Sequence, residues 1–213
     1  MEARPTLSLI MLLSMTPHFI FGSSVSFVLD CAASKSPAQS EKIQQLMRIL
    51  SVFGTRPEAI KMAPVVLALA GTKGVTSRIC VTGQHRQMLD DVLATFSLTP
   101  DYDLDIMRPD QTLSDVFAGV LQGLDSILAR FKPDFVLVQG DTASSTAAAL
   151  AAFFRSIRVG HVEAGLRTGN LASPWPEEAN RRLTAVVASR HYAPTRRACA
   201  ALLKEGHDAE SID

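Results

Sequence analysis

VFGTRPEAIKMAP (Val52–Pro64) and VGHVEAGLRT (Val159–Thr168) are the two stretches that decide how this chain folds. Each follows a short apolar run and opens a helical pattern, so each lies at the carboxyl end of a predicted parallel strand. The segment QGDT (Gln139–Thr142) follows the apolar run Asp134–Val138 in the same way. Open α/β sheets bind ligands at this edge. The sequence therefore predicts a ligand site built from these three segments.

Strands and helices alternate on either side of these stretches. Strands are expected at Arg48–Phe53, Ser77–Thr82, Asp134–Val138, Arg158–Val162 and Arg190–Ala193, with a weaker one at Asp103–Met107. Helices are expected at Glu58–Ala70, Arg86–Phe96, Thr112–Phe131, Ser144–Phe154, Glu177–Ala188 and Thr195–Glu205. This alternation is typical of an α/β fold with a doubly wound parallel sheet, which is Rossmann-like.

The chain divides into an N-terminal extension, residues 1–46, and one domain, residues 47–213. Leu7–Leu29 is apolar-rich but is interrupted by Pro17 and several serines, which disfavours a membrane-spanning helix. Three interpretations stay open: translation begins at Met47, the extension is a signal or anchor, or it is translated and poorly ordered. The first is favoured because Met47 directly precedes the first strand.

Composition excludes several classes of protein. The 213 residues carry 21 basic and 21 acidic side chains, so nothing in the net charge favours nucleic acid. The pairs Arg181-Arg182 and Arg196-Arg197 are interpreted as solvated helix faces, with phosphate contact as the alternative. Three cysteines without a CxxC pair predict reduced thiols in a cytoplasmic protein and no zinc cluster.

Neither a GxGxxG after the first strand nor a GxxxxGK[ST] motif occurs, so the sequence supports no dinucleotide or Walker-type site and no cofactor. His161 and Glu163 form an HxE pair, but the P-C-x-x-C of zinc deaminases is missing, so no metal is expected.

Three carboxylates are the candidate acid–base groups: Asp141, Glu163 and Glu177. Acids around one pocket can divide proton-transfer roles when their surroundings separate their pKa values. Asp141 has a structural alternative as a helix N-cap or turn residue, and Glu177 has one as a first-turn acid that stabilises the helix dipole. Glu163, in apolar company, has no obvious structural role.

Cations accompany these acids at the predicted edge. Arg56 and Lys61 flank a helix N-terminus, which is an arrangement that binds anions. Arg56 has the alternative of pairing with Glu58 or another local carboxylate. His161 and Arg167 belong to the same edge, and together these residues suit a phosphorylated substrate that undergoes proton transfer.

Five segments together resemble the non-hydrolysing UDP-N-acetylglucosamine 2-epimerases. They are FGTRPEAIKMAP (Phe53–Pro64), VTGQHRQMLDDVL (Val81–Leu93), VQGDT (Val138–Thr142), VGHVEAGLRTGN (Val159–Asn170) and SPWPEEANRRLT (Ser173–Thr184). The resemblance implies the N-terminal domain of a GT-B-like two-domain fold, with an active site between the domains and a homodimeric assembly. Because only the first half of the family pattern is matched, the chain is expected to be truncated.

The resemblance also implies a reaction. Family members expel UDP from carbon 1 while removing the hydrogen on carbon 2, pass through 2-acetamidoglucal, and re-add UDP to give UDP-N-acetylmannosamine for surface polysaccharides. Asp141, Glu163 and Glu177 match the catalytic acids, and Arg56 and Lys61 match the substrate-contacting cations. His161 and Arg167 are the further substrate-binding candidates.

Gln84, His85 and Gln87 match residues that bind an activating UDP-N-acetylglucosamine in some bacterial members. Asp110 stands where those members carry a basic residue, which argues against activation here. Two functions stay open: an epimerase represented by a shortened chain, or an inactive remnant or split-half binding module that needs a partner domain. The chain alone is expected to be inactive.

Overall fold

The structure is a computed structural model that describes residues 46–83 and 86–213. The interpretations of the N-terminal extension, and the candidate residues Gln84 and His85, lie outside the described residues.

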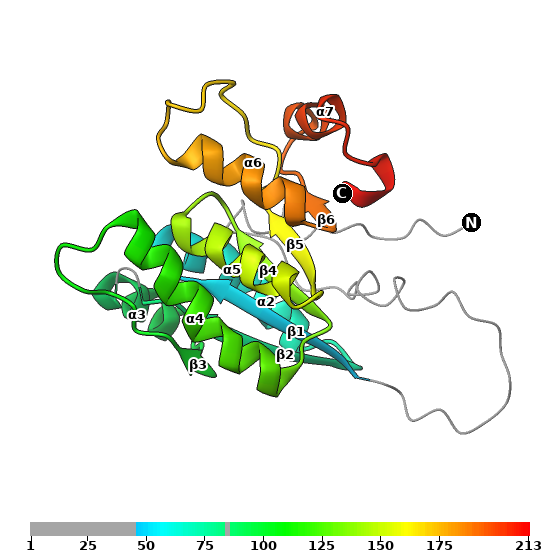
Figure 1. Ribbon diagram of the computed structural model, residues 1–213. Helices are drawn as coiled ribbons and strands as arrows, with labels where there is room; N and C mark the ends of the chain where they lie inside the picture. The colour runs from blue at the N-terminus through cyan, green and yellow to red at the C-terminus, as the bar shows by residue number, and fades with distance from the viewer. Residues whose placement is uncertain (1–45, 84–85) are drawn as a thin grey trace, which may run out of the picture.

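Six parallel strands form one sheet in the order β3-β2-β1-β4-β5-β6 (Figure 1). The strands are β1 (Met47–Phe53), β2 (Val75–Val81), β3 (Tyr102–Asp103), β4 (Phe135–Gln139), β5 (Arg158–Val162) and β6 (Arg190–Tyr192). The central pair, β1 and β4, runs in register from Ile49–Phe135 to Val52–Val138. The predicted doubly wound parallel sheet is confirmed. The strand expected at Asp103–Met107 is wrong in extent, since β3 has only two residues and pairs with the end of β2.

Helices connect the strands and cover both faces. They are α2 (Arg56–Ala70), α3 (Arg86–Thr95), α4 (Leu113–Phe131), α5 (Ala143–Phe154), α6 (Glu177–Val187) and α7 (Arg196–Lys204), followed by the 3-10 turn η2 (Ala209–Ser211). Alternate residues of β1 serve two cores: Ile49 and Phe53 pack with α2 and α3, whereas Leu50 and Val52 pack with α4 and α5. The order of strands places the ends of β1, β4 and β5 at one edge, as predicted.

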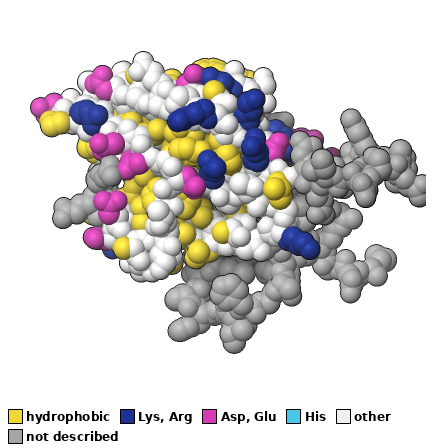
Figure 2. All heavy atoms as spheres, turned by 90° about the horizontal axis from the view of Figure 1, so that it is seen from below, with side chains coloured by type: hydrophobic (Ala, Val, Ile, Leu, Met, Phe, Trp, Pro, Cys, Tyr) yellow, Lys and Arg dark blue, Asp and Glu magenta, His cyan; other side chains and the backbone are white. Residues whose placement is uncertain are grey.

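The surface keeps some apolar area. In the face seen from below, hydrophobic side chains run across the middle and Lys and Arg side chains gather to one side (Figure 2). None of the helices among the described residues is long and apolar enough to cross a membrane.

The helix α7 is held against the β5–α6 loop by a close backbone contact. A Cβ added to Gly165 would lie 2.4 Å from the carbonyl oxygen of Ala198 in α7, and Gly165 has φ +85°. Gly169, in the same loop, has φ +81° and nothing within 4 Å of such an atom. Substitutions at these two glycines therefore distinguish the cost of a steric clash from the cost of a left-handed backbone.

We expect Gly165→Ala to lower the free energy of unfolding by about 2–4 kcal/mol, because it adds a backbone clash to the cost of a left-handed alanine. Gly169→Ala is the matched control and should cost about 1–2 kcal/mol, which is the conformational cost alone. Urea unfolding of both variants measures the difference. Equal losses would show that the Gly165–Ala198 approach is unimportant.

Candidate functional site

The loop after β1 is fixed by the buried carboxylate of Glu58. Thr55 caps α2, and Glu58 Oε2 accepts hydrogen bonds from the backbone N–H groups of Gly54 and Thr55 at 2.7 and 2.8 Å. Its other oxygen accepts one from Thr142 Oγ1 at 2.7 Å. Burial raises the pKa of Glu58, although these hydrogen bonds act to lower it. The loops after β1 and β4 are thus joined by one side chain.

Arg56 is the first residue of α2 and is exposed. The alternative in which it pairs with Glu58 is wrong, because that carboxylate is turned inward and only 2% exposed. Within residues 46–83 and 86–213, no hydrogen bond or ion pair engages the Arg56 side chain. Its guanidinium is available at the sheet edge.

Glu163 lies at the centre of the site. Its carboxylate Oε2 is 2.5 Å from Lys61 Nζ of α2 and also accepts a hydrogen bond from Gln139 Nε2 at the end of β4. Its backbone is left-handed, with φ 65°, directly after β5. Non-glycine residues adopt this conformation at a cost, and such residues cluster at functional sites. The structure therefore brings Lys61 and Glu163 together as the sequence indicated, and adds Gln139.

Asp141 is held by α6. Its carboxylate is 2.7 Å from Arg181, and its backbone carbonyl accepts a hydrogen bond from Asn180 Nδ2 at 2.9 Å. The N-cap interpretation of Asp141 is wrong, because Thr142 caps α5 by accepting from Ser145 N. The interpretation of Arg181 as part of a solvated face is also wrong, since its side chain is only 15% exposed.

Glu177 and Glu178 have different surroundings although they are neighbours. Glu177 opens α6 and is partly buried, and among the described residues no hydrogen bond or ion pair reaches its side chain. Glu178 is fully buried and accepts hydrogen bonds from Thr168 N and Gly169 N, both at 3.1 Å. Burial opposes its ionisation, but these N–H groups and Arg181 outweigh burial and lower the pKa of Glu178. It fixes the β5–α6 loop.

His161 and Arg167 have partners other than Lys61 and Glu163. His161 is fully buried, and its Nε2 donates to the Gly140 carbonyl at 2.7 Å. Arg167 reaches α7, where its Nε and one terminal nitrogen each lie 2.8 Å from an oxygen of Glu205. Their substrate-binding roles stay predictions, and their positions favour support of the turn at Gly140 and of the β5–α6 loop.

The structure adds little about the remaining predicted residues. Gln87 lies in α3, and Asp110 is exposed, with φ 56°, before α4. Across the described part of the chain, no three His, Cys, Asp or Glu side chains are grouped so that they would hold a metal ion.

Proteins of one family resemble this chain in sequence and in fold. A family model described as UDP-N-acetylglucosamine 2-epimerase matches residues 67–213. The chain belongs to this family. Enzymes of that name from Yersinia pestis and Escherichia coli K12 are each 59% identical over 159 residues, covering 75% of this chain and 42% of the relative. The chain therefore spans under half the length of these curated relatives.

Solved epimerases share the fold. The Neisseria meningitidis enzyme, determined bound to UDP-GlcNAc, is 54% identical with a TM-score of 0.76, covering 78% of this chain and 45% of that one. The Methanocaldococcus jannaschii enzyme, in complex with UDP-GlcNAc and UDP, is 37% identical with a TM-score of 0.74, covering 78% of this chain and 46% of that one. The galactosyltransferase WaaB, at 13% identity and a TM-score of 0.54, shows a likeness of fold alone.

Sequence reasoning missed the parts that three residues play at this sheet edge: Gln139, Glu178 and Arg181. The sequence does place Gln139 at the ligand-binding edge, because this residue ends a buried strand directly before Gly140-Asp141. Glu178 follows Glu177 by one residue, so the two point to different sides of α6. Arg181, three residues after Glu178, is placed to pair with it.

Two buried histidines give the domain a pH-dependent stability. His161 and His191 are register partners on β5 and β6, and burial is the main cause that lowers the pKa of each to about 4. A histidine whose folded pKa lies below its unfolded value of about 6.5 takes up its proton on unfolding. Its contribution is therefore complete above that unfolded value and is lost as the pH falls toward the folded one.

We expect the free energy of unfolding to fall between about pH 6.5 and pH 4, by on the order of 1–3 kcal/mol for each histidine. Urea titrations at several pH values across that window measure the slope. His191→Gln should flatten the slope by about one proton, whereas His207→Gln should flatten it much less, because burial and not the neighbouring His207 is the largest cause that lowers the pKa of His191. An unchanged slope in His191→Gln would contradict the assignment.

Proposed function

We propose that the chain carries one face of the active site of a UDP-N-acetylglucosamine 2-epimerase, which interconverts UDP-N-acetylglucosamine and UDP-N-acetylmannosamine. The observation that carries the proposal is Glu163, a carboxylate held at the sheet edge by Lys61 and Gln139 on a left-handed backbone. Support comes from the relatives of this name, among them a structure bound to UDP-GlcNAc.

The chemistry explains why carboxylates and cations are needed. The hydrogen on carbon 2 is not next to a carbonyl group, so direct deprotonation is unfavourable. Removing it as a proton while UDP leaves carbon 1 forms the double bond of 2-acetamidoglucal, and protonation of the other face with return of UDP completes the inversion. This route needs a base, an acid on the opposite face and cations for the departing diphosphate.

The described side chains suit these roles. Glu163 and Asp141 come from the ends of neighbouring strands, so we assign them to proton transfer at carbon 2, with Glu177 as a third acid at the start of α6. Arg56 has no ion-pair partner among the described residues, and with Lys61 it would receive the diphosphate. His161 and Arg167 would act by supporting the edge.

Other features of the proposal follow from the family resemblance. They are a homodimer, a cytoplasmic location, supply of surface polysaccharide precursors, and a GT-B-like partner domain across the site. Activation through Gln84, His85 and Gln87 is disfavoured by Asp110. The alternative is an inactive truncated remnant or a split-half binding module that needs a partner domain.

A polypeptide of these 213 residues should show no measurable epimerisation. The residues at the sheet edge form one side of a site, and preorganised charges with water excluded supply much of the lowering of a reaction barrier. Proton NMR of UDP-N-acetylglucosamine incubated with the purified chain detects the epimer. Sustained turnover would overturn this expectation.

The catalytic assignment is best tested in a chimera in which residues 47–213 replace the matching part of the Escherichia coli relative. Glu163→Gln keeps shape and hydrogen-bonding capacity but cannot transfer a proton. We expect turnover and solvent deuterium incorporation at carbon 2 to fall by about two to four decades, with an unchanged melting temperature.

Asp125→Asn is the control, because Asp125 pairs with Arg155 on the exposed surface of α4 and should leave turnover unchanged. Wild-type deuterium exchange in Glu163→Gln would make Glu163 structural. A chimera that folds, binds UDP and shows no turnover would favour the binding-module alternative.

A further inference from the structure

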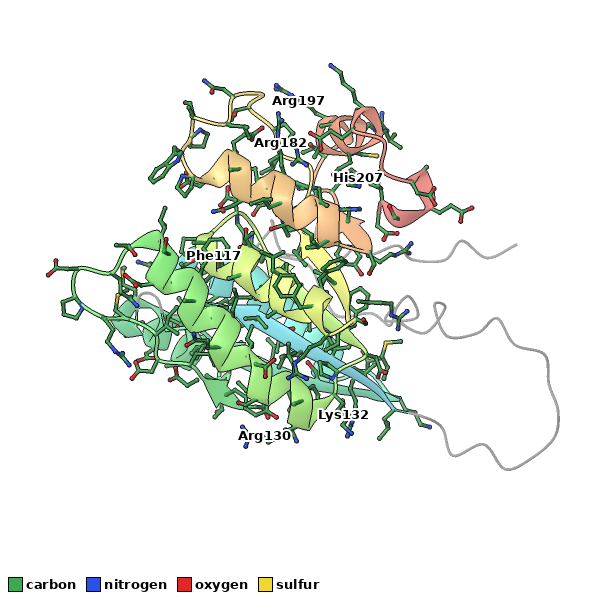
Figure 3. The ribbon with its side chains drawn as sticks, in the orientation of Figure 1. Phe117, Arg130, Lys132, Arg182, Arg197 and His207 are labelled. Carbon is green, nitrogen blue, oxygen red and sulfur yellow. The ribbon has the colours of Figure 1, made fainter. Side chains whose placement is uncertain are left out.

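A pocket of about 670 Å³ lies between the β5–α6 loop, α6 and α7. Its charged lining is mostly basic: Arg167, Arg181, Arg182, Arg197 and Lys204, with Glu205 as the carboxylate. In Figure 3, Arg182 of α6 and Arg197 of α7 lie near one another at the space between the two helices. We call this pocket the α6–α7 groove.

Nearby carboxylates leave part of this charge unbalanced. Arg167 is paired with Glu205, and Arg181 is paired with Asp141 and Glu178. Arg182 lies 3.5 Å from Glu178, a long contact, and its Nε is buried without a hydrogen bond to any described residue.

Arg197 and Lys204 have no ion pair within the described residues. Five cations therefore have three carboxylates near them, and of these three only Glu205 lines the groove. An uncompensated cluster of this kind repels itself unless an anion is bound.

The groove also has the form of a small-molecule site. Its volume falls in the range of about 300–1,000 Å³ typical of ligand pockets. Leu166, Ala198 and Ala201 supply an apolar floor. Thr195 caps α7, so the positive end of the helix dipole adds to the basic side chains.

This groove is separate from the proposed acid–base residues. Arg56, Lys61, Asp141 and Glu163 do not belong to its described lining. The two are linked through Arg181, which lines the groove and also forms the ion pair with Asp141. Occupancy of the groove can therefore alter the charge that faces Asp141.

We propose that the α6–α7 groove is a binding site for a diphosphate, either free or as part of a nucleoside diphosphate. Arginine forks match the paired oxygens of phosphates, and Lys204 adds a point charge. The apolar floor accommodates the less polar part of such a ligand. Both members of the pair Arg181-Arg182 line the groove. Of the pair Arg196-Arg197, only Arg197 does.

Isothermal titration of the purified chain with inorganic pyrophosphate tests the proposal. The Arg197→Gln variant should weaken binding by about fivefold, and Arg197→Gln with Lys204→Gln by about 20-fold or more, since each phosphate-contacting cation contributes on the order of one ion pair. Both side chains are exposed, and unchanged melting temperatures would confirm folding. Arg196→Gln is the matched control and should change the affinity by less than about twofold.

The same titrations in an Arg56→Gln/Lys61→Gln background separate the groove from the proposed substrate edge. Pyrophosphate binding that survives in this background and is lost with Arg197 and Lys204 supports the groove, whether or not the epimerase proposal holds. UDP as a second probe shows whether the nucleoside adds affinity.

Two results would overturn the proposal. One is binding that disappears with Arg56 and Lys61 yet is indifferent to Arg197 and Lys204. The other is the absence of any pyrophosphate or UDP binding at low ionic strength, which would favour an acidic polypeptide as the ligand of the groove.

Discussion

The buried carboxylate of Glu58 is the constraint on which the site depends. It joins three backbone or side-chain donors from two loops that are far apart in sequence, at Gly54, Thr55 and Thr142. A buried acid without partners costs several kcal/mol, whereas one that accepts three hydrogen bonds can be retained. Because Thr55 and Thr142 also cap α2 and α5, the starts of both helices and the loop carrying Asp141 are set by one group.

A second buried carboxylate fixes a loop in the same way nearer the C-terminus. Glu178 accepts from Thr168 N and Gly169 N and contacts Arg181, so it ties the β5–α6 loop to α6. Arg181 in turn reaches Asp141. The left-handed Glu163 directly follows β5 and precedes the loop residues that Glu178 fixes. Its unusual backbone is tolerated because the segments before and after it are fixed independently.

The sequence predicted the sheet and the ligand-binding edge because both depend on local patterns. Apolar runs followed by Gly-Thr-Arg-Pro or Gly-Asp-Thr identify strand ends, and a regular helical period identifies α4. The pairing partners could not be predicted this way. Asp141 was open to interpretation as a cap because Thr142 stands beside it, and Arg181 was interpreted as solvated because nothing local reveals an acid forty residues earlier. The short β3 was overestimated because its partner, β2, offers it only two residues of pairing.

The charges at the edge explain how a diphosphate substrate would be received. Lys61 is paired with Glu163 and Arg181 with Asp141, so two of the three candidate acids already have a cation. A diphosphate bound here would compete with these carboxylates for their cations. The ion pairs that hold the two acids would therefore weaken when the substrate binds. Arg56 needs no such exchange, since no described group holds it. Arg56 is therefore the side chain best placed to contact the diphosphate first. Lys61 would contact it next, while still partly paired with Glu163. In the proposed epimerase, these ion pairs would keep the free site neutral, and diphosphate binding would leave a carboxylate free to accept a proton.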